Sequence, residues 1–270
     1  MAHSETAYAK LNLALHVRSR RDDGYHELET LFAFVDSGDV LSATSHAQDE
    51  VRIVGEFAAV LSNPFDNLVS RALTLLPRPD GLAILLDKRL PVAAGLGGGS
   101  ADAAAVFRIV EARHGLPGDW HERAARLGAD VPACVRSTPC IGRGTGTQLE
   151  PVANDLAGTP VLLVNPRIPL STAPVFAGWV GVDRGPLTGT TMRDIAVGGR
   201  NDLQAAAASL CPVVGQVLDA LDKTGAWLVR MSGSGATCFA LYDDAASRDV
   251  AQRKLQSVQP AWWTLAGSLR

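Results

Sequence analysis

The chain has 270 residues, of which 47% are hydrophobic and 20% are charged, and its formal net charge is −3. This length fits two packed domains, and the composition is that of a globular protein able to bury a sizeable core. The small negative charge, without a basic stripe, argues against nucleic acid as a partner. The N-terminus lacks the apolar core of a secretory signal and no apolar run is long enough to span a bilayer, so we expect a cytoplasmic protein without a membrane partner.

The four cysteines are scattered along the sequence without a Cys-x-x-Cys spacing, at Cys134, Cys140, Cys211 and Cys238. This pattern is typical neither of a zinc site nor of a disulfide framework. No histidine accompanies them in an arrangement that indicates a catalytic cysteine. We therefore expect reduced thiols in a cytosolic protein.

Strict alternation of apolar residues from Thr6 to Val17 predicts the first strand. Its second face is more polar, and there Lys10 and Asn12 project about 6–7 Å apart along the strand. On the residues alone, the simplest interpretation is that this face meets solvent. A lysine beside an asparagine can also line a cleft.

The residues that follow predict a turn at 18–24, then the segment Tyr25-His26-Glu27-Leu28 and an apolar run through Phe32 and Phe34. Turn and cap residues further along predict a helix over 67–76 capped by Asp66, a strand at 83–86, a helix after residue 100 closed by Gly115, and a helix from a capping box at 119–122 to Gly128. Asp130 stands two residues before Pro132, and this proline biases Val131 away from helix. An aspartate at such a junction is most often a cap or turn residue.

The segment from Pro91 to Ala105, PVAAGLGGGSADAAA, is the most informative of the chain. Four glycines in five residues let the backbone approach a ligand closely, and an alanine-rich helix follows, with Ser100 in the position expected of its N-cap. Unpaired N–H groups and the positive end of the helix dipole make such a helix start a phosphate site. The spacing matches neither the Walker A loop nor the dinucleotide fingerprint.

The second half of the chain predicts, in order, a strand at 161–164, an alanine-rich helix capped by Asn201 and Asp202, a helix opened by Pro212 and closed by Gly225, a glycine-rich turn at 230–236, a strand at 237–242, a helix at 247–258 and a strand at 262–265. Strands and helices mix without a regular βαβ alternation, so the fold class is α+β. We place the domain boundary near residue 155, between an N-terminal domain at 1–155 and a C-terminal domain at 156–270.

Three of these segments, in this order, resemble the motifs of the GHMP kinase superfamily: Lys10-Leu11-Asn12-Leu13, Pro91 to Ala105, and Ser232-Gly233-Ser234-Gly235-Ala236. The resemblance covers essentially the whole chain. It implies a ribosomal-protein-S5-like N-terminal domain, a ferredoxin-like C-terminal domain and an active site in the cleft between them.

Within the superfamily, the segments Asp23-Gly24-Tyr25-His26, Gly128-Ala129-Asp130-Val131-Pro132 and Asn201-Asp202-Leu203 resemble one branch. That branch uses ATP to phosphorylate the 2-hydroxyl of 4-diphosphocytidyl-2-C-methyl-D-erythritol, in the non-mevalonate route to isoprenoid precursors. The resemblance implies a small-molecule partner with a cytidine diphosphate group and the cofactors ATP and Mg²⁺. It leaves open whether the protein is a monomer or a weak homodimer.

The resemblance also implies roles for individual residues. Asp130 is the general base and Lys10 its partner, which keeps the carboxylate ionised and steadies the phosphoryl charge, as phosphoryl transfer requires. Tyr25, His26 and Phe176 hold the cytidine, and Asn12 contacts the polar tail of the substrate. Asn67 and Lys88 border the nucleotide site, and the ATP phosphates lie on Pro91, Val92, Ala93, Ala94, Gly95, Leu96, Gly97, Gly98, Gly99, Ser100 and Ala101. No direct protein ligand of the metal is implied, apart from the possible approach of Ser100.

The chain departs from the family pattern at two places. Ala93 and Ala94 stand where many relatives carry more glycine, and Gln204 stands where the family often has glutamate. Two rivals remain: a homoserine or mevalonate type of GHMP kinase, and a catalytically dead binding module on the same fold. Tyr25 and His26 argue against the first, because those substrates offer no base to stack, and the presence of both Lys10 and Asp130 argues against the second.

Overall fold

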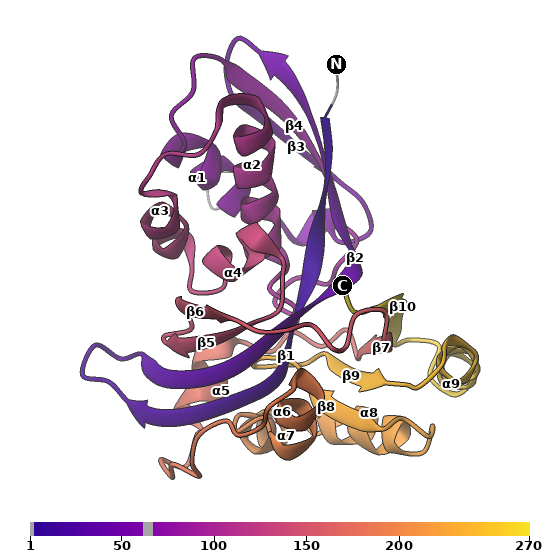
Figure 1. Ribbon diagram of the computed structural model, residues 1–270. Coiled ribbons are helices and arrows are strands. Elements are labelled where there is room, and N and C mark those ends of the chain that lie inside the picture. Colours follow the sequence, from indigo (N-terminus) through magenta and orange to yellow (C-terminus); the bar gives the residue numbers. More distant parts are fainter. Residues whose placement is uncertain (1–2, 62–66) are drawn as a thin grey trace. The chain divides into compact units, whose positions relative to one another are not determined.

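The computed structural model describes residues 3–61 and 67–270 (Figure 1). The chain divides into two compact units that alternate along the sequence. Unit 1 comprises Met1–Lys10, Ser37–Val92 and Gly97–Ser137, and unit 2 comprises Leu11–Asp36, Ala93–Leu96 and Thr138–Arg270. Two long strands, β1 (His3–Arg20) and β2 (His26–His46), pass from one unit into the other. The boundary near residue 155 stays a prediction.

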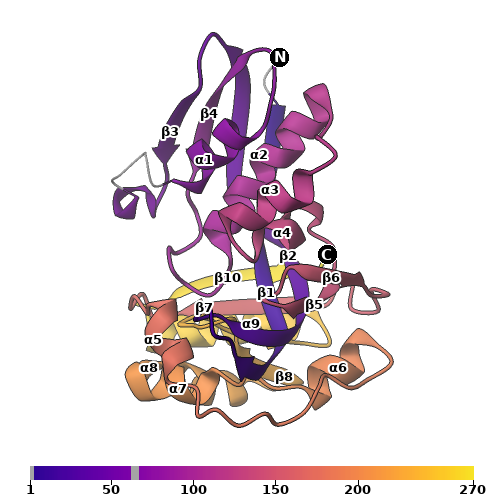
Figure 2. The same cartoon turned by 90° about the vertical axis from the view of Figure 1, so that its left-hand side faces the viewer.

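Unit 1 combines strands with a group of helices. Its other elements are β3 (Glu50–Val54), the 3₁₀ turn η1 (Ala58–Val60), α1 (Leu68–Leu75), β4 (Gly81–Asp87), α2 (Gly98–His114), α3 (Trp120–Leu127) and α4 (Val131–Arg136). Strand β4 pairs parallel to β3 and antiparallel to the second half of β2. Helix α2 packs against α1, α3 and α4, and Figure 2 shows these helices gathered beside β3 and β4. Because α2 is the central helix, its alanine-rich middle is completely buried.

Several helix starts in unit 1 differ from the prediction. Helix α2 begins at Gly98 with Gly97 as its N-cap, so Ser100 lies inside the first turn. Asp66 lies outside the described residues, and the N-cap of α1 is Asn67, whose side chain accepts a hydrogen bond from Val69 N. Since glycine is itself a good cap and reaches left-handed φ, a glycine run obscures the cap in the sequence.

The other two differences lie around α3 and α4. Asp119 is the N-cap residue of α3 without a side-chain cap bond, because its carboxylate accepts from Arg123 Nε at 2.8 Å instead. Val131 is helical although Pro132 follows it, and α4 begins there directly after Asp130. Proline is tolerated in a first turn, where its missing N–H is not needed. The expected helix closures at Gly115 and Gly128 are confirmed.

Unit 2 holds a four-stranded antiparallel sheet in the order β10-β7-β9-β8. Its elements are β5 (Cys140–Gly144), β6 (Gln148–Pro151), β7 (Pro160–Asn165), α5 (Thr172–Ala177), α6 (Met192–Gly198), α7 (Gln204–Leu210), α8 (Val213–Asp222), β8 (Leu228–Met231), β9 (Cys238–Leu241), α9 (Ala245–Val258) and β10 (Trp263–Ser268). Helices α8 and α9 pack on the sheet, and their apolar residues form one core with β7 and β9. Strand β5 pairs antiparallel with the first half of β2, and β6 pairs antiparallel with β5.

Two predicted boundaries in unit 2 are wrong. Helix α7 begins at Gln204 and its N-cap is Leu203, because Asn201 makes a turn by accepting from Leu203 N at 2.9 Å. Asp202 is buried and instead accepts from Val17 N at 2.9 Å and from Arg200 Nε at 2.7 Å. Helix α8 ends at Asp222, before Gly225.

The α+β class predicted from the order of the elements is confirmed. Among the described residues, no helix is long and apolar enough to cross a membrane.

Candidate active site

Unit 1 brings Lys10 of β1 and Asp130 at the start of α4 into contact. Lys10 Nζ lies 3.0 Å from Asp130 Oδ2. The Lys10 side chain is only 4% exposed, whereas that of Asp130 is 33% exposed. The interpretation that the polar face of β1 meets solvent is therefore wrong: Lys10, Asn12 and His16 are all buried. Asp130 makes no side-chain cap bond to α4, and its carboxylate contacts the Lys10 ammonium while staying partly exposed.

The glycine-rich loop 91–97, which leads into α2, contacts this ion pair at Gly97. Gly97 has a φ of 60°, and a Cβ added there would lie 3.0 Å from Lys10 Cε and 3.6 Å from Asp130 Oδ2. The first intrahelical bond of α2 runs from Ala101 N to Gly97 O at 2.8 Å. The N–H groups of Gly98, Gly99 and Ser100 precede that bond, as the first amides of any helix do. A helix start with free amides, next to a lysine and a carboxylate, suits a phosphate that is to be transferred.

A buried ion cluster of Asp39, Lys88 and Asp102 lies next to the same helix start. Lys88 Nζ contacts Asp39 Oδ2 and lies 2.7 Å from Asp102 Oδ2, and all three side chains are at most 3% exposed. Burial lowers the pKa of Lys88, but attraction to the two carboxylates outweighs it, so this pKa lies above its usual value. Burial raises the pKa of Asp102, against the effect of Lys88. Both pKa values are therefore raised: Lys88 keeps its charge between the two aspartates, and Asp102 tends to hold its proton.

Asp39 connects this cluster to the two residues just before Pro91. Its Oδ1 accepts from Arg89 N at 2.6 Å and from Leu90 N at 2.8 Å. A Cβ added to Gly98 would lie 3.2 Å from Lys88 Nζ. The cluster therefore contacts the chain on both sides of the loop 91–97: at Arg89 and Leu90 before the loop, and at Gly98 after it.

In unit 2, Asn12 and the middle of the glycine segment meet the second glycine-rich turn. Ser232 Oγ donates to Gly95 O at 2.8 Å, and Asn12 N donates to Ser232 Oγ at 3.3 Å. Thr237 N donates to Ala94 O at 3.1 Å. A Cβ on Gly95 would lie 2.3 Å from Ser232 O, so only glycine fits there. The two glycine-rich motifs are thus parts of one structure.

Residues Ala93 and Asn12 have their own constraints in this region. Ala93 has a φ of 52°, a left-handed conformation in which an alanine is strained and a glycine is not. The Asn12 side chain donates to Thr30 Oγ1 at 2.7 Å, which fixes the direction of its amide. Leu96 of this segment is buried, as is Ala101 in α2.

Unit 2 also gathers an aromatic cluster. The His26 ring centroid lies 5.0 Å from that of Phe176 in α5 and 5.9 Å from that of Trp179, which meets it edge-on. Burial lowers the pKa of His26, and the nearby charge of Arg20 lowers it further, so the ring is neutral at pH 7. Within the described residues, the buried His26 Nε2 has no hydrogen-bond partner. Tyr25 is 63% exposed.

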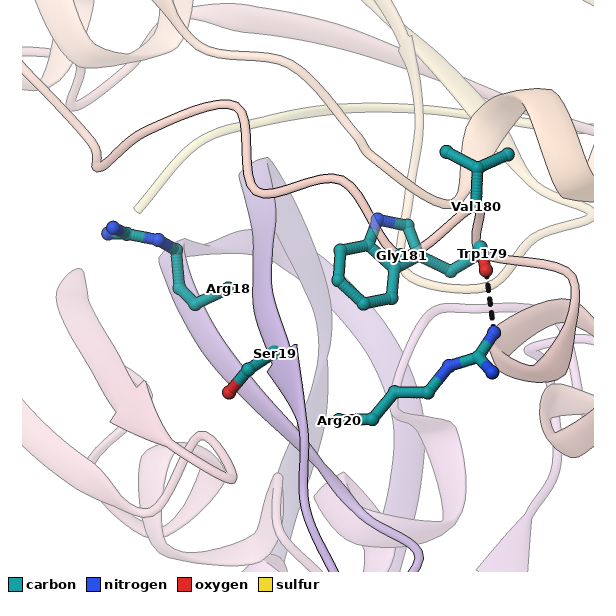
Figure 3. Close-up of a pocket in the computed structure, with 6 residues that line it drawn as sticks. All are labelled: Arg18, Ser19, Arg20, Trp179, Val180 and Gly181. Atoms are coloured by element: carbon teal, nitrogen blue, oxygen red, sulfur yellow. Dashed lines mark hydrogen bonds between the residues drawn. The ribbon is translucent and has the colours of Figure 1, made fainter.

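A cavity of about 280 Å³ opens beside Trp179 (Figure 3). Its lining is formed by Arg18, Ser19, Arg20, Trp179, Val180 and Gly181. Figure 3 shows the Arg20 guanidinium bonded to the Trp179 carbonyl, with the indole ring facing into the space between the two segments. Neither Arg20 nor Trp179 was expected from the sequence, and nothing in the spacing of the two residues signals their contact.

The remaining predicted residues have clear places. Asn67 Oδ1 caps α1, and its buried Nδ2 has no partner among the described residues. A Cβ added to Gly128 would lie 3.8 Å from Ser100 Oγ, so Ser100 faces the segment that leads to Asp130.

All four cysteines are buried free thiols, and burial raises the pKa of Cys140 to about 12, which keeps it un-ionised. Across residues 3–61 and 67–270, no group of three or more metal-ligating side chains is found.

We expect Gly97→Ala to lower kcat tenfold or more, because a displacement of about 1 Å in a reacting group costs that much. The added Cβ presses on Lys10, and alanine resists the φ of 60°. Steady-state kinetics and ATP titration by calorimetry measure the effect. Gly118→Ala is the control, since a Cβ there meets nothing within 4 Å. Wild-type kcat in Gly97→Ala would show that this close approach has no part in catalysis.

Comparison with known proteins matches both halves of the chain to one family. The N-terminal domain of GHMP kinases matches residues 67–138, and the C-terminal domain of GHMP kinases matches residues 187–261. The 4-diphosphocytidyl-2-C-methyl-D-erythritol kinase of Novosphingobium aromaticivorans is 67% identical over 270 residues, covering 100% of this chain and 94% of that protein. The enzyme of the same name from Erythrobacter litoralis is 62% identical, covering 99% of each.

A solved structure supports the same conclusion. The crystal structure of a 4-(cytidine 5′-diphospho)-2C-methyl-D-erythritol kinase superposes with a TM-score of 0.81 at 32% identity, covering 99% of both chains. The family and the two-domain α+β architecture expected from the sequence are confirmed. The chain therefore belongs to the GHMP kinase family of small-molecule kinases, in the branch of the 4-diphosphocytidyl-2-C-methyl-D-erythritol kinases.

Proposed function

We propose that this chain transfers the γ-phosphoryl group of ATP to the 2-hydroxyl of 4-diphosphocytidyl-2-C-methyl-D-erythritol. The products are the 2-phosphate and ADP, and the step serves the non-mevalonate route to isoprenoid precursors. The names of the relatives supply the substrate. The observation that carries the chemistry is the 3.0 Å contact of Lys10 Nζ with Asp130 Oδ2 beside Gly97.

In this mechanism Asp130 accepts the proton of the 2-hydroxyl while the hydroxyl oxygen bonds to the γ-phosphorus. The bond from that phosphorus to the bridging oxygen breaks, and ADP leaves with the electron pair. Lys10 holds the Asp130 carboxylate in place and offsets the negative charge of the transferring group. Positioning and charge stabilisation of this kind provide most of the catalysis in phosphoryl transfer.

The helix start of α2 is our assignment for the ATP phosphates. The amides of Gly98, Gly99 and Ser100 supply donors at the positive end of the dipole of α2, a helix of 17 residues. Mg²⁺, where ATP carries it, would offset phosphate charge, and the Ser100 hydroxyl is the protein oxygen that we assign to it. Asn67 Nδ2 provides a buried donor for the nucleotide. Lys88 is occupied by two carboxylates, so we assign it to the support of the loop.

The aromatic cluster of unit 2 is our assignment for the cytidine. Tyr25 is exposed enough to stack on a base, and Phe176 offers a second ring face beside His26. The neutral His26 ring has an unpaired nitrogen for the edge of the base. We assign Asn12 to the polar tail of the substrate. A test of turnover with this substrate, beside homoserine and mevalonate, decides the proposal: use of homoserine or mevalonate alone would contradict it.

Loss of one stacking ring tests the base site. We expect Tyr25→Ala or Phe176→Ala to weaken substrate binding by about 1–3 kcal/mol, which is the usual worth of one base–aromatic contact. His26→Ala should instead reduce discrimination between cytidine and uridine substrates, because a hydrogen-bonding site rejects the wrong edge through unpaired buried groups. ATP affinity should not change in any of the three.

The measurement is kcat/KM for the cytidine and uridine substrates in wild type and in each variant. Trp120→Ala is the control, since Trp120 lies on α3 in unit 1 and contacts Arg136. A base preference that survives the loss of all three side chains would remove them from the cytidine site and leave the kinase assignment intact.

A further inference from the structure

Helix α5, which carries Phe176, is too short to be stable by itself. It spans six residues, Thr172–Ala177, whereas isolated helices shorter than about 12 residues are marginal in water. Its position therefore depends on contacts with the rest of unit 2. Val175 packs into the core, and Thr172 Oγ1 lies 3.0 Å from Ser234 Oγ of the second glycine-rich turn. These contacts hold the middle and the N-terminal end of the helix.

Arg20, the last residue of β1, holds the other end. Its Nη2 donates to Ala177 O at 3.0 Å and to Trp179 O at 2.6 Å. The last carbonyls of a helix carry partial negative charge and lack intrahelical donors, so a guanidinium is well suited to them. The Arg20 Cζ also lies 5.9 Å from the centre of the Trp179 ring.

Phe176 and Trp179 both contact the His26 ring, and both lie in the segment that Arg20 holds. We propose that Arg20 is a positioning residue for the base site, which fixes the end of α5 so that Phe176 and Trp179 form the wall behind His26. Trp179 thereby joins Tyr25, His26 and Phe176 in the site. The inference rests on the proposed function, because it takes this cluster to be the cytidine site.

Three further observations agree with this role. The Arg20 charge adds to burial in lowering the pKa of His26, which favours the neutral ring, and only a neutral ring has a nitrogen that can accept a hydrogen bond. Arg20 and Trp179 both line the 280 Å³ cavity, so loss of the guanidinium would let the ring move into open space (Figure 3). Trp179 is only 5% exposed, so such a movement needs release of its backbone.

The test replaces Arg20 by Met, which keeps the length of the side chain and removes its donors. We expect the KM for the cytidine substrate to rise about tenfold, with kcat and the KM for ATP within about twofold of wild type. The preference for cytidine over uridine should fall as well. Arg20→Lys keeps the charge and one set of donors, so it should restore part of the affinity.

Arg193→Met is the matched control. Arg193 lies 4.0 Å from the centre of the Trp227 ring and pairs with Asp243, so it is an arginine on a tryptophan elsewhere in unit 2. Its kinetics should equal those of wild type. Thermal melting of each variant establishes that it is folded, and if Arg20→Met does not fold, Arg20→Lys and Arg20→Gln give the same comparison.

The outcomes separate the inference from the proposed function. Wild-type KM and base preference in the Arg20 variants would overturn the inference and leave the kinase assignment intact. Equal losses in kcat, in the KM for ATP and in the KM for the substrate would also overturn it, because they indicate a general structural role. Absence of turnover by the wild-type protein with the cytidine substrate would instead contradict the proposed function.

Discussion

Replacing either member of the Lys10–Asp130 pair is expected to lower kcat by at least about 100-fold, the low end for loss of a positioned acid–base or charge-stabilising group. Asp130→Asn keeps the shape of the side chain and removes the base. Lys10→Met keeps most of the buried stem and removes the charge. Both variants should remain folded. In Lys10→Met, water can solvate the Asp130 side chain, which is 33% exposed. In Asp130→Asn, the amide oxygen can still accept a hydrogen bond from the Lys10 ammonium.

The measurement is single-turnover phosphoryl transfer, together with ATP binding by calorimetry. ATP binding should persist in Asp130→Asn, since we assign the phosphates to the amides of α2. Asp119→Asn is the control, because it breaks an exposed aspartate pair with Arg123 in the same unit. Turnover at the wild-type rate in Asp130→Asn would remove Asp130 from the mechanism.

The sequence predicted the element types better than their boundaries. Alternation identifies β1, and an alanine-rich run closed by Gly115 identifies α2, because these patterns extend over many residues. Helix starts depend instead on a competition for single hydrogen bonds. Asp119 bonds Arg123 rather than its own helix, and α2 is capped by Gly97 rather than Ser100. Local patterns do not show which partner wins such a competition.

The site was predictable only in part, for a related reason. The contact of Lys10 with Asp130 joins distant segments, so the residues alone favoured a solvent-facing lysine and a structural aspartate, and only the family resemblance paired them. Asp39 was missed, because β2 carries four acidic residues and the sequence does not mark which of them is buried. Arg20 and Trp179 meet through backbone carbonyls, which any residue type supplies, so no side-chain pattern marks that contact.

The buried cluster of Asp39, Lys88 and Asp102 gives the largest expected effect on stability. Lys88→Met leaves the buried Asp39 carboxylate beside Asp102 without its counter-charge, and we expect a loss of about 3–5 kcal/mol in the free energy of unfolding. Asp39→Asn should cost a similar amount, because it turns an amide toward the ammonium and removes the anion that holds Arg89 N and Leu90 N.

Asp102→Asn is the matched comparison, since it makes the same chemical change on the other side of Lys88. Burial raises the pKa of Asp102, so its carboxyl already tends toward the neutral form that asparagine mimics. Its Oδ1 has no partner among the described residues, so little bonding is lost there. We expect a cost of about 1 kcal/mol or less, the worth of one ordinary hydrogen bond. Urea unfolding of the three variants measures the difference, and equal losses for Asp39→Asn and Asp102→Asn would contradict this division of charge.

Because Asp39 holds the backbone just before Pro91, the Asp39 variant should also weaken ATP binding at temperatures where it is still folded, whereas the Asp102 variant should bind ATP as wild type does.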